Sequence, residues 1–111
     1  MSKEYSVRIA PAAQTQLSEL IRYITQVLQA PQAALHLLNQ IDREIQSLSH
    51  FPMRFPCLED EPWHSMGIRK MPVKSVLVYY FADELTAAVH VIAVINGRRD
   101  QLSQLSLLEI E

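Results

Sequence analysis

Two Ala-Pro pairs divide the first half of this chain into two segments, each with apolar residues three or four positions apart. Proline fits the first position of a helix, because the N–H that it lacks has no partner there. Pro11 and Pro31 therefore predict helices over about residues 11–29 and 31–49. The apolar stripe of the first helix consists of Leu17, Leu20, Ile21, Ile24, Val27 and Leu28. So short a break between the two helices predicts an antiparallel helical hairpin.

Other segments have the composition of strands. Residues 5–9 alternate apolar and polar side chains, and residues 68–73, 75–81 and 86–95 are rich in Val, Ile and aromatic residues. The resulting order, β-α-α-β-β-β, predicts an α+β fold in which the helical hairpin packs on one face of a small antiparallel sheet. The first strand is expected to pair within that sheet, because alone it could not satisfy its backbone hydrogen-bonding groups.

Residues 50–66 fit neither pattern. Pro52, Pro56 and Pro62 prevent a regular helix or a central strand there, which predicts a long loop. Loops of this length tend to be functional or mobile. The chain has no repeats and no compositional boundary, and 111 residues are enough for one hydrophobic core and too few for two. Residues 1–111 are therefore expected to form a single domain.

Composition argues against several classes of function. Ten basic and twelve acidic side chains give a net charge of −2, which disfavours non-specific binding to duplex nucleic acid. The longest wholly apolar run, residues 76–82, is far too short to span a bilayer, and the first residues lack the apolar segment of a secretory signal. The single cysteine, Cys57, fits a reducing compartment. We therefore expect no membrane contact and a cytoplasmic location.

Motifs for cofactors and metals are also missing from the sequence. Two glycines cannot supply a phosphate-binding loop, so nucleotide-dependent catalysis is not expected. The four histidines and Cys57 have no tight metal-ligand spacing, and structural or surface histidines are the favoured interpretation. We expect neither a metal site nor a small-molecule cofactor.

Basic residues gather in the predicted sheet and directly after its strands. They are Arg69, Lys70, Lys74, Arg98 and Arg99. If the last strand lies beside residues 68–73, these side chains could converge on one face and bind phosphate groups. Alternatively, they are solvated edge charges, which discourage association between sheets. Composition alone favours the second interpretation, and both stay open at this point.

Short motifs in a consistent order cover nearly the whole chain. They are Val7–Ala13, Gln16–Ile24, Phe51–Pro52 with Arg54–Pro56, Gly67–Lys70, Leu77–Tyr80 and Val94–Asp100. In this order and spacing the motifs resemble the ParE/RelE superfamily, the toxins of bacterial type II toxin–antitoxin systems. The resemblance implies a sheet that forms a groove. It also implies a partner antitoxin whose C-terminal segment covers the helical hairpin and the sheet.

Two activities occur in that superfamily. RelE-like toxins cut mRNA on the ribosome without a metal, using Lys and Arg from the strands and a late Tyr or His for proton transfer. ParE-like toxins inhibit DNA gyrase by binding it. In this chain Val76 stands where the nucleases carry an arginine, no Tyr follows Tyr80, and no His follows His90. These departures favour a binding protein over an enzyme.

The resemblance therefore favours a ParE-like toxin that inhibits DNA gyrase, arrests growth, contributes to plasmid stabilization and is neutralised by a cognate antitoxin. One alternative is a RelE-like endoribonuclease, whose partners would be the ribosome and mRNA. A second alternative is a degenerate member that binds an antitoxin and has no toxicity.

The resemblance also assigns roles to individual residues. Contact with the target is expected from Arg69, Lys70, Lys74, Arg98 and Arg99. Antitoxin binding is expected from Leu17, Leu20, Tyr23, Leu38, Ile41 and Ile45. A ParE-like toxin needs no catalytic residue, whereas a nuclease would use Arg69, Lys70, Arg98, His64 and Tyr80.

Overall fold

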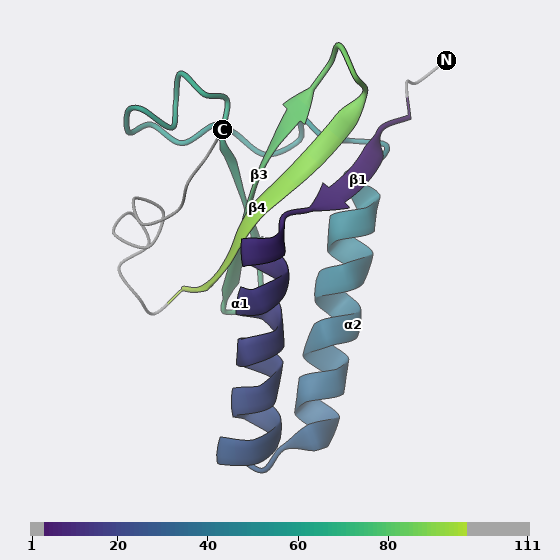
Figure 1. The fold of residues 1–111 in the computed structure, drawn as a ribbon, viewed down its shortest axis with the longest axis vertical. Coiled ribbons are helices and arrows are strands. Elements are labelled where there is room, and N and C mark those ends of the chain that lie inside the picture. Colours follow the sequence, from purple (N-terminus) through teal and green to yellow (C-terminus); the bar gives the residue numbers. More distant parts are fainter. Residues whose placement is uncertain (1–3, 98–111) are drawn as a thin grey trace.

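A helical hairpin packs against a four-stranded sheet in the computed structural model, which describes residues 4–97 (Figure 1). In chain order the elements are β1 (Ser6–Ile9), α1 (Pro11–Arg22), η1 (Tyr23–Val27), α2 (Pro31–Ser47), β2 (Arg69–Val73), β3 (Val76–Asp83) and β4 (Ala88–Asn96). This order confirms the predicted α+β class. The predictions for Arg98 and Arg99 lie outside the described residues.

The strands form one sheet in the order β1-β4-β3-β2. The pairs β2–β3 and β3–β4 are antiparallel, as predicted, whereas β1 pairs with β4 in the parallel direction. Short turns between β2, β3 and β4 impose antiparallel pairing, but the helical hairpin and two strands separate β1 from β4 along the chain. The sheet is therefore mixed rather than wholly antiparallel.

Both faces of the sheet bury side chains. On one face, which we call the helix side, Ile41 and Ile45 of α2 belong to the same cluster as Tyr80 of β3. On the opposite face, which we call the loop side, Leu58 and Trp63 pack against the buried residues of the sheet. The loop at 50–66 is therefore part of the hydrophobic structure.

A β-bulge changes which face of the sheet the residues of β4 occupy. Tyr80 pairs with Val91 and Tyr79 pairs with Ala93, so Ile92 is an extra residue in β4. An extra residue resets the alternation of side chains between the two faces. Val91 accordingly belongs to the helix-side cluster, whereas Ile92 and Ala93 both belong to the loop-side cluster.

The first helix does not stay regular to residue 29, so that prediction is wrong for its last turn. α1 ends at Arg22 and continues as the π-helical turn η1, in which the N–H of Leu28 donates to the carbonyl of Tyr23 (3.1 Å). A π turn contains more residues than an α turn and shifts the following side chains around the helix axis. Val27 and Leu28, predicted to lie on the buried stripe, are consequently 65% and 55% exposed.

Gln29 ends this helical segment with φ 51°, in the left-handed region that favours glycine. We expect Gln29→Gly to raise the free energy of unfolding by up to about 1 kcal/mol, because a side chain with a Cβ is strained there. Urea unfolding followed by circular dichroism measures the change. As a control, Gln26→Gly within η1 should lower stability by about 0.5 kcal/mol. The same sign for both substitutions would contradict the argument.

Candidate functional site

The adjacent basic residues of β2 lie on opposite faces of the sheet. Arg69 pairs with Tyr80 and, like Met71, belongs to the helix side, whereas Lys70 pairs with Tyr79 on the loop side. Successive side chains of a strand alternate between faces, so Arg69 and Lys70 do not converge on one ligand. The structure therefore does not bring these two cations together.

Lys74 occupies the turn between β2 and β3, where it is exposed with φ 55°. Neither Lys70 nor Lys74 forms an ion pair within residues 4–97. Arg98 and Arg99 lie outside the described residues. Among the described basic residues predicted to contact a target, Lys70 and Lys74 therefore carry charges that are available to a partner.

Arg69 and Tyr80 both bind residues 51–56, which we call the strap. The Arg69 guanidinium donates hydrogen bonds to the carbonyl oxygens of Phe55 (2.5 Å) and Met53 (3.3 Å). The Tyr80 hydroxyl donates to the carbonyl oxygen of Pro52 (2.8 Å). Burial raises the pKa of Tyr80, an effect that the positive charge of Arg69 partly opposes. The hydroxyl therefore keeps its proton, and both side chains hold the strap in this structure.

Arg54 connects the strap to α2, a role that the sequence did not indicate. Its guanidinium donates to the Ser47 hydroxyl (2.8 Å), lies 3.5 Å from the Glu44 carboxylate and sits 5.0 Å from the centre of the Phe55 ring. Partly exposed ion pairs of this kind contribute at most about 1 kcal/mol. The only available signal was the short motif Arg54–Pro56, which carried no functional assignment.

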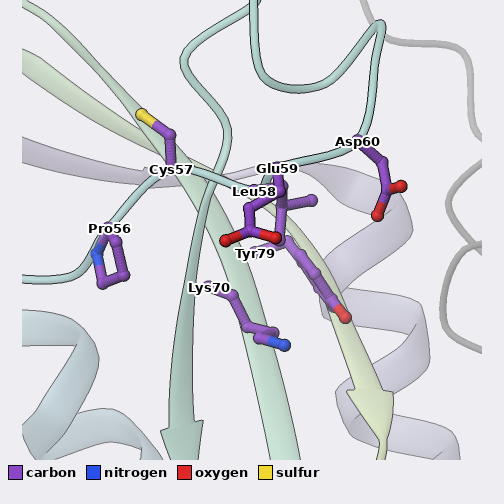
Figure 2. Close-up of a pocket in the computed structure, with 7 residues that line it drawn as sticks. All are labelled: Pro56, Cys57, Leu58, Glu59, Asp60, Lys70 and Tyr79. Atoms are coloured by element: carbon purple, nitrogen blue, oxygen red, sulfur yellow. The ribbon is translucent and has the colours of Figure 1, made fainter.

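A cavity of about 450 Å³ opens beside β2 on the loop side (Figure 2). The sheet contributes Lys70 and Tyr79, and the loop contributes Pro56, Cys57, Leu58, Glu59 and Asp60. The two carboxylates and the ammonium of Lys70 form no ion pair within residues 4–97. Two carboxylates beside one ammonium repel a phosphate group. The cavity is therefore better suited to polar groups of a protein than to the phosphates of RNA.

His64, a candidate proton carrier, lies in the loop and is held by it. Its Nδ1 lies 2.8 Å from the carbonyl oxygen of Leu58, and a carbonyl only accepts, so Nδ1 donates the proton. Nearby, Glu61 accepts hydrogen bonds from the hydroxyl and the backbone N–H of Ser65, which lower the pKa of Glu61. Tyr80, the other candidate, lies on the opposite side of the sheet from Leu58. The two candidates therefore do not share a site.

The residues expected to bind an antitoxin divide into two groups. Ile41 and Ile45 are 0% and 1% exposed and belong to the helix-side core. The half-buried or exposed members are Leu17, Leu20, Leu38 and Tyr23. In this conformation only the second group offers surface to a partner.

The described part of the chain holds neither a cluster of metal ligands nor a helix that could span a membrane. Within residues 4–97, no three side chains among His, Cys, Asp and Glu lie close enough together to hold a metal ion. The helices of the same residues are too short or too polar to cross a membrane.

Burial raises the pKa of Tyr79 from 10 to about 12. Between these values the folded chain retains a proton that the unfolded chain has lost, so raising the pH favours unfolding. We expect the contribution of Tyr79 to stability to be constant below about pH 10 and to be lost between about pH 10 and 12. Urea unfolding across this range should show a smaller loss in Tyr79→Phe. Tyr23→Phe, which removes a hydroxyl from a half-exposed site, is the control.

Comparison with known protein families matches residues 7–101 to the ParE toxin of the type II toxin–antitoxin system parDE. The chain belongs to the ParE toxin family. The predicted superfamily, the toxins of type II toxin–antitoxin systems, is thereby confirmed. A search of curated proteins gave no match for this ParE-family chain.

Solved structures share the fold of this ParE-family chain. The chromosomal ParDE system of Pseudomonas aeruginosa matches with a TM-score of 0.68 and 15% identity, over 86% of this chain and 98% of that one. A RelBE toxin–antitoxin complex from Mycobacterium tuberculosis matches with a TM-score of 0.60 and 19% identity, over 84% of this chain and 98% of that one. A mutant of the E. coli toxin RelE in the free state matches with a TM-score of 0.60 and 13% identity, over 95% of this chain and 99% of that one. At these identities the likeness establishes the fold.

Proposed function

We propose that this ParE-family chain inhibits DNA gyrase by binding it and is neutralised by a cognate antitoxin. The observation that carries the proposal is the match to the ParE toxin family over residues 7–101. In this proposal the toxin meets its target in the cytoplasm, and growth arrest follows from blocked DNA synthesis. Contribution to plasmid stabilization would follow where a plasmid carries the toxin–antitoxin pair.

A binding mechanism fits the side chains that the described residues make available. Arg69 and Tyr80 are engaged with the strap, and His64 lies apart from Tyr80. Recognition of a protein target needs complementary charge and shape but no proton carrier. Lys70 and Lys74, whose ammonium groups form no ion pair within residues 4–97, are the proposed target contacts together with Arg98 and Arg99.

The antitoxin is proposed to cover the helical hairpin at Leu17, Leu20, Tyr23 and Leu38. Tyr23 is 50% exposed, and the exposed side chains of Val27, Leu28 and Leu35 belong to the same end of the hairpin. Clustered exposed apolar side chains are typical of sites that bind other proteins. This interpretation assigns Ile41 and Ile45 to the support of that surface from the core.

The proposal is tested by adding the purified chain to a DNA supercoiling reaction with gyrase. We expect inhibition, and we expect the double variant Lys70→Glu/Lys74→Glu to inhibit about tenfold less, because both reversed charges would face the target. The double variant Arg22→Glu/Arg43→Glu is the matched control, since it reverses two exposed cations of the helical hairpin and changes the net charge by the same amount. Equal loss in the control would contradict the assignment of the target contacts to Lys70 and Lys74.

Induction of the chain in cells without an antitoxin separates the alternatives. Pulse labelling should show an early fall in DNA synthesis while translation continues. An early fall in translation with shortened transcripts would instead support a RelE-like nuclease and overturn the proposal. If neither process falls, the toxic activity is lost or directed at another target, and the gyrase proposal is overturned.

A further inference from the structure

The β2 edge of the sheet is protected against pairing with another chain. Pro72 has no N–H to offer. Cys57 of the loop forms a β-bridge with Arg69, and the N–H of Leu58 donates to the carbonyl of Ile68 (2.8 Å). Proline and a covering loop are common ways in which proteins protect an edge strand.

β1 forms the opposite edge of the sheet (Figure 1). Among residues 4–97, none protects this edge at Val7 and Ile9 in such a way. The N–H of Ser6 donates to the carbonyl of Ala87 (2.9 Å), and the N–H of Ala10 donates to the carbonyl of Val91 in β4 (2.9 Å). Backbone groups of a strand alternate between its two edges. The N–H and C=O of Val7 and the N–H of Ile9 therefore point away from the sheet, and no residue among 4–97 bonds to them.

The open part of this edge is short and has a defined chemical pattern. It ends at Tyr5, whose N–H donates to the carbonyl of Ser49 (2.8 Å), and at α1 on the other side. The side chains of Val7 and Ile9 are half-buried on the helix side. Arg8, between them, is exposed on the other face and forms no ion pair within residues 4–97.

A second copy of this chain is a poor occupant of the edge. In an antiparallel pair of β1 strands, only the register that places Arg8 opposite Arg8 uses the outward groups of both Val7 and Ile9. Like charges directly opposite each other in a sheet are destabilising. Other registers place Tyr5, whose N–H is already bonded, or Pro11 opposite the open groups. In addition, a four-residue strand buries far less than the roughly 800 Å² per partner of a stable interface.

We propose that the β1 edge binds an extended segment of a different protein with the pattern apolar–acidic–apolar. The acidic side chain faces Arg8 and supplies the carboxylate that Arg8 lacks within the described residues. The two apolar side chains lie beside Val7 and Ile9 and continue the helix-side surface. The outward backbone groups supply hydrogen bonds, and the alternating side chains supply specificity, as in other strand-addition complexes.

This inference goes beyond the proposed function. It concerns β1 rather than Lys70 and Lys74, and it requires neither toxicity nor gyrase. Its failure would leave the supercoiling experiment unaffected, and inactivity toward gyrase would leave strand addition at β1 unaffected.

The test is a titration of the isotope-labelled full chain with two blocked peptides, TTVEVTT and TTVKVTT, followed by amide NMR spectra. We expect the Val7 and Ile9 signals to shift on addition of TTVEVTT, with binding about two- to fivefold tighter than that of TTVKVTT. In Arg8→Glu the preference should reverse in favour of TTVKVTT. The same spectra show whether the variant is folded.

Val7→Pro supplies a second variant, because proline removes an outward N–H and leaves the hydrogen bonds of Ser6 intact. In this variant the affinity for TTVEVTT should fall at least twofold. The proposal is overturned if neither peptide shifts the β1 signals of the wild-type chain, or if the preference is the same in Arg8→Glu. It is also overturned if the wild-type chain dimerises through β1 without peptide.

Discussion

Replacing Ile41 by alanine is expected to lower the free energy of unfolding by about 2–5 kcal/mol. Ile41 is fully buried on α2, in the helix-side cluster that contains Val78 and Tyr80. The smaller side chain loses buried apolar surface and leaves a cavity that the packed sheet closes only in part. Domains of this size have a total stability of roughly 5–15 kcal/mol, so the loss is a large fraction of it. Urea unfolding followed by circular dichroism measures the change.

Leu38→Ala is the matched control on the same helix. Leu38 is half-buried, so its truncation removes less buried surface and should cost about 1 kcal/mol. Both residues were expected to bind an antitoxin, and the pair therefore separates core packing from partner contact. If Leu38→Ala costs as much stability as Ile41→Ala, burial does not distinguish their roles.

The parts of the fold that local sequence determines were predicted well. Pro11 and Pro31 begin α1 and α2, and the runs rich in Val and Ile became β3 and β4. These signals are local, since a proline or a repeating apolar spacing acts within one or two turns of its own segment. The parallel pairing of β1 with β4 depends on residues about eighty positions apart, which no local pattern encodes.

The candidate site could be predicted only in part, for two physical reasons. Alternation along a strand already implied that Arg69 and Lys70 face opposite ways, and expecting them on one face neglected it. The partners of Arg69 could not be predicted from such a pattern, because they are the backbone carbonyl oxygens of Met53 and Phe55 in a loop. Any residue type can provide a carbonyl oxygen, so sequence does not mark such a partner.

The second large loss of stability is expected when the hydrogen bonds that hold the strap are removed. Arg69→Met keeps most of the side-chain stem but removes the donors to Phe55 and Met53, and we expect it to lower the free energy of unfolding by about 1–3 kcal/mol. Tyr80→Phe removes the donor to Pro52 from the same face and should cost about as much, because the buried carbonyl loses its partner. In both variants, the backbone amides of Phe51, Met53, Arg54 and Phe55 should exchange their hydrogens faster than in the wild-type chain, whereas the exchange in α1 should stay unchanged.

These two variants also test how Arg69 would contribute to the gyrase inhibition that we propose. Tyr80→Phe leaves the charge of Arg69 in place and loosens the strap from a second point. If Arg69 positions the strap, both variants should weaken gyrase inhibition by similar factors, and Arg69→Lys should restore only part of it, because a lysine cannot reproduce the fork of the guanidinium. If Arg69 contacts the target through its charge, Arg69→Lys should retain most of the inhibition and Tyr80→Phe should retain all of it. The latter result would add Arg69 to the proposed target contacts, on the opposite face of the sheet from Lys70.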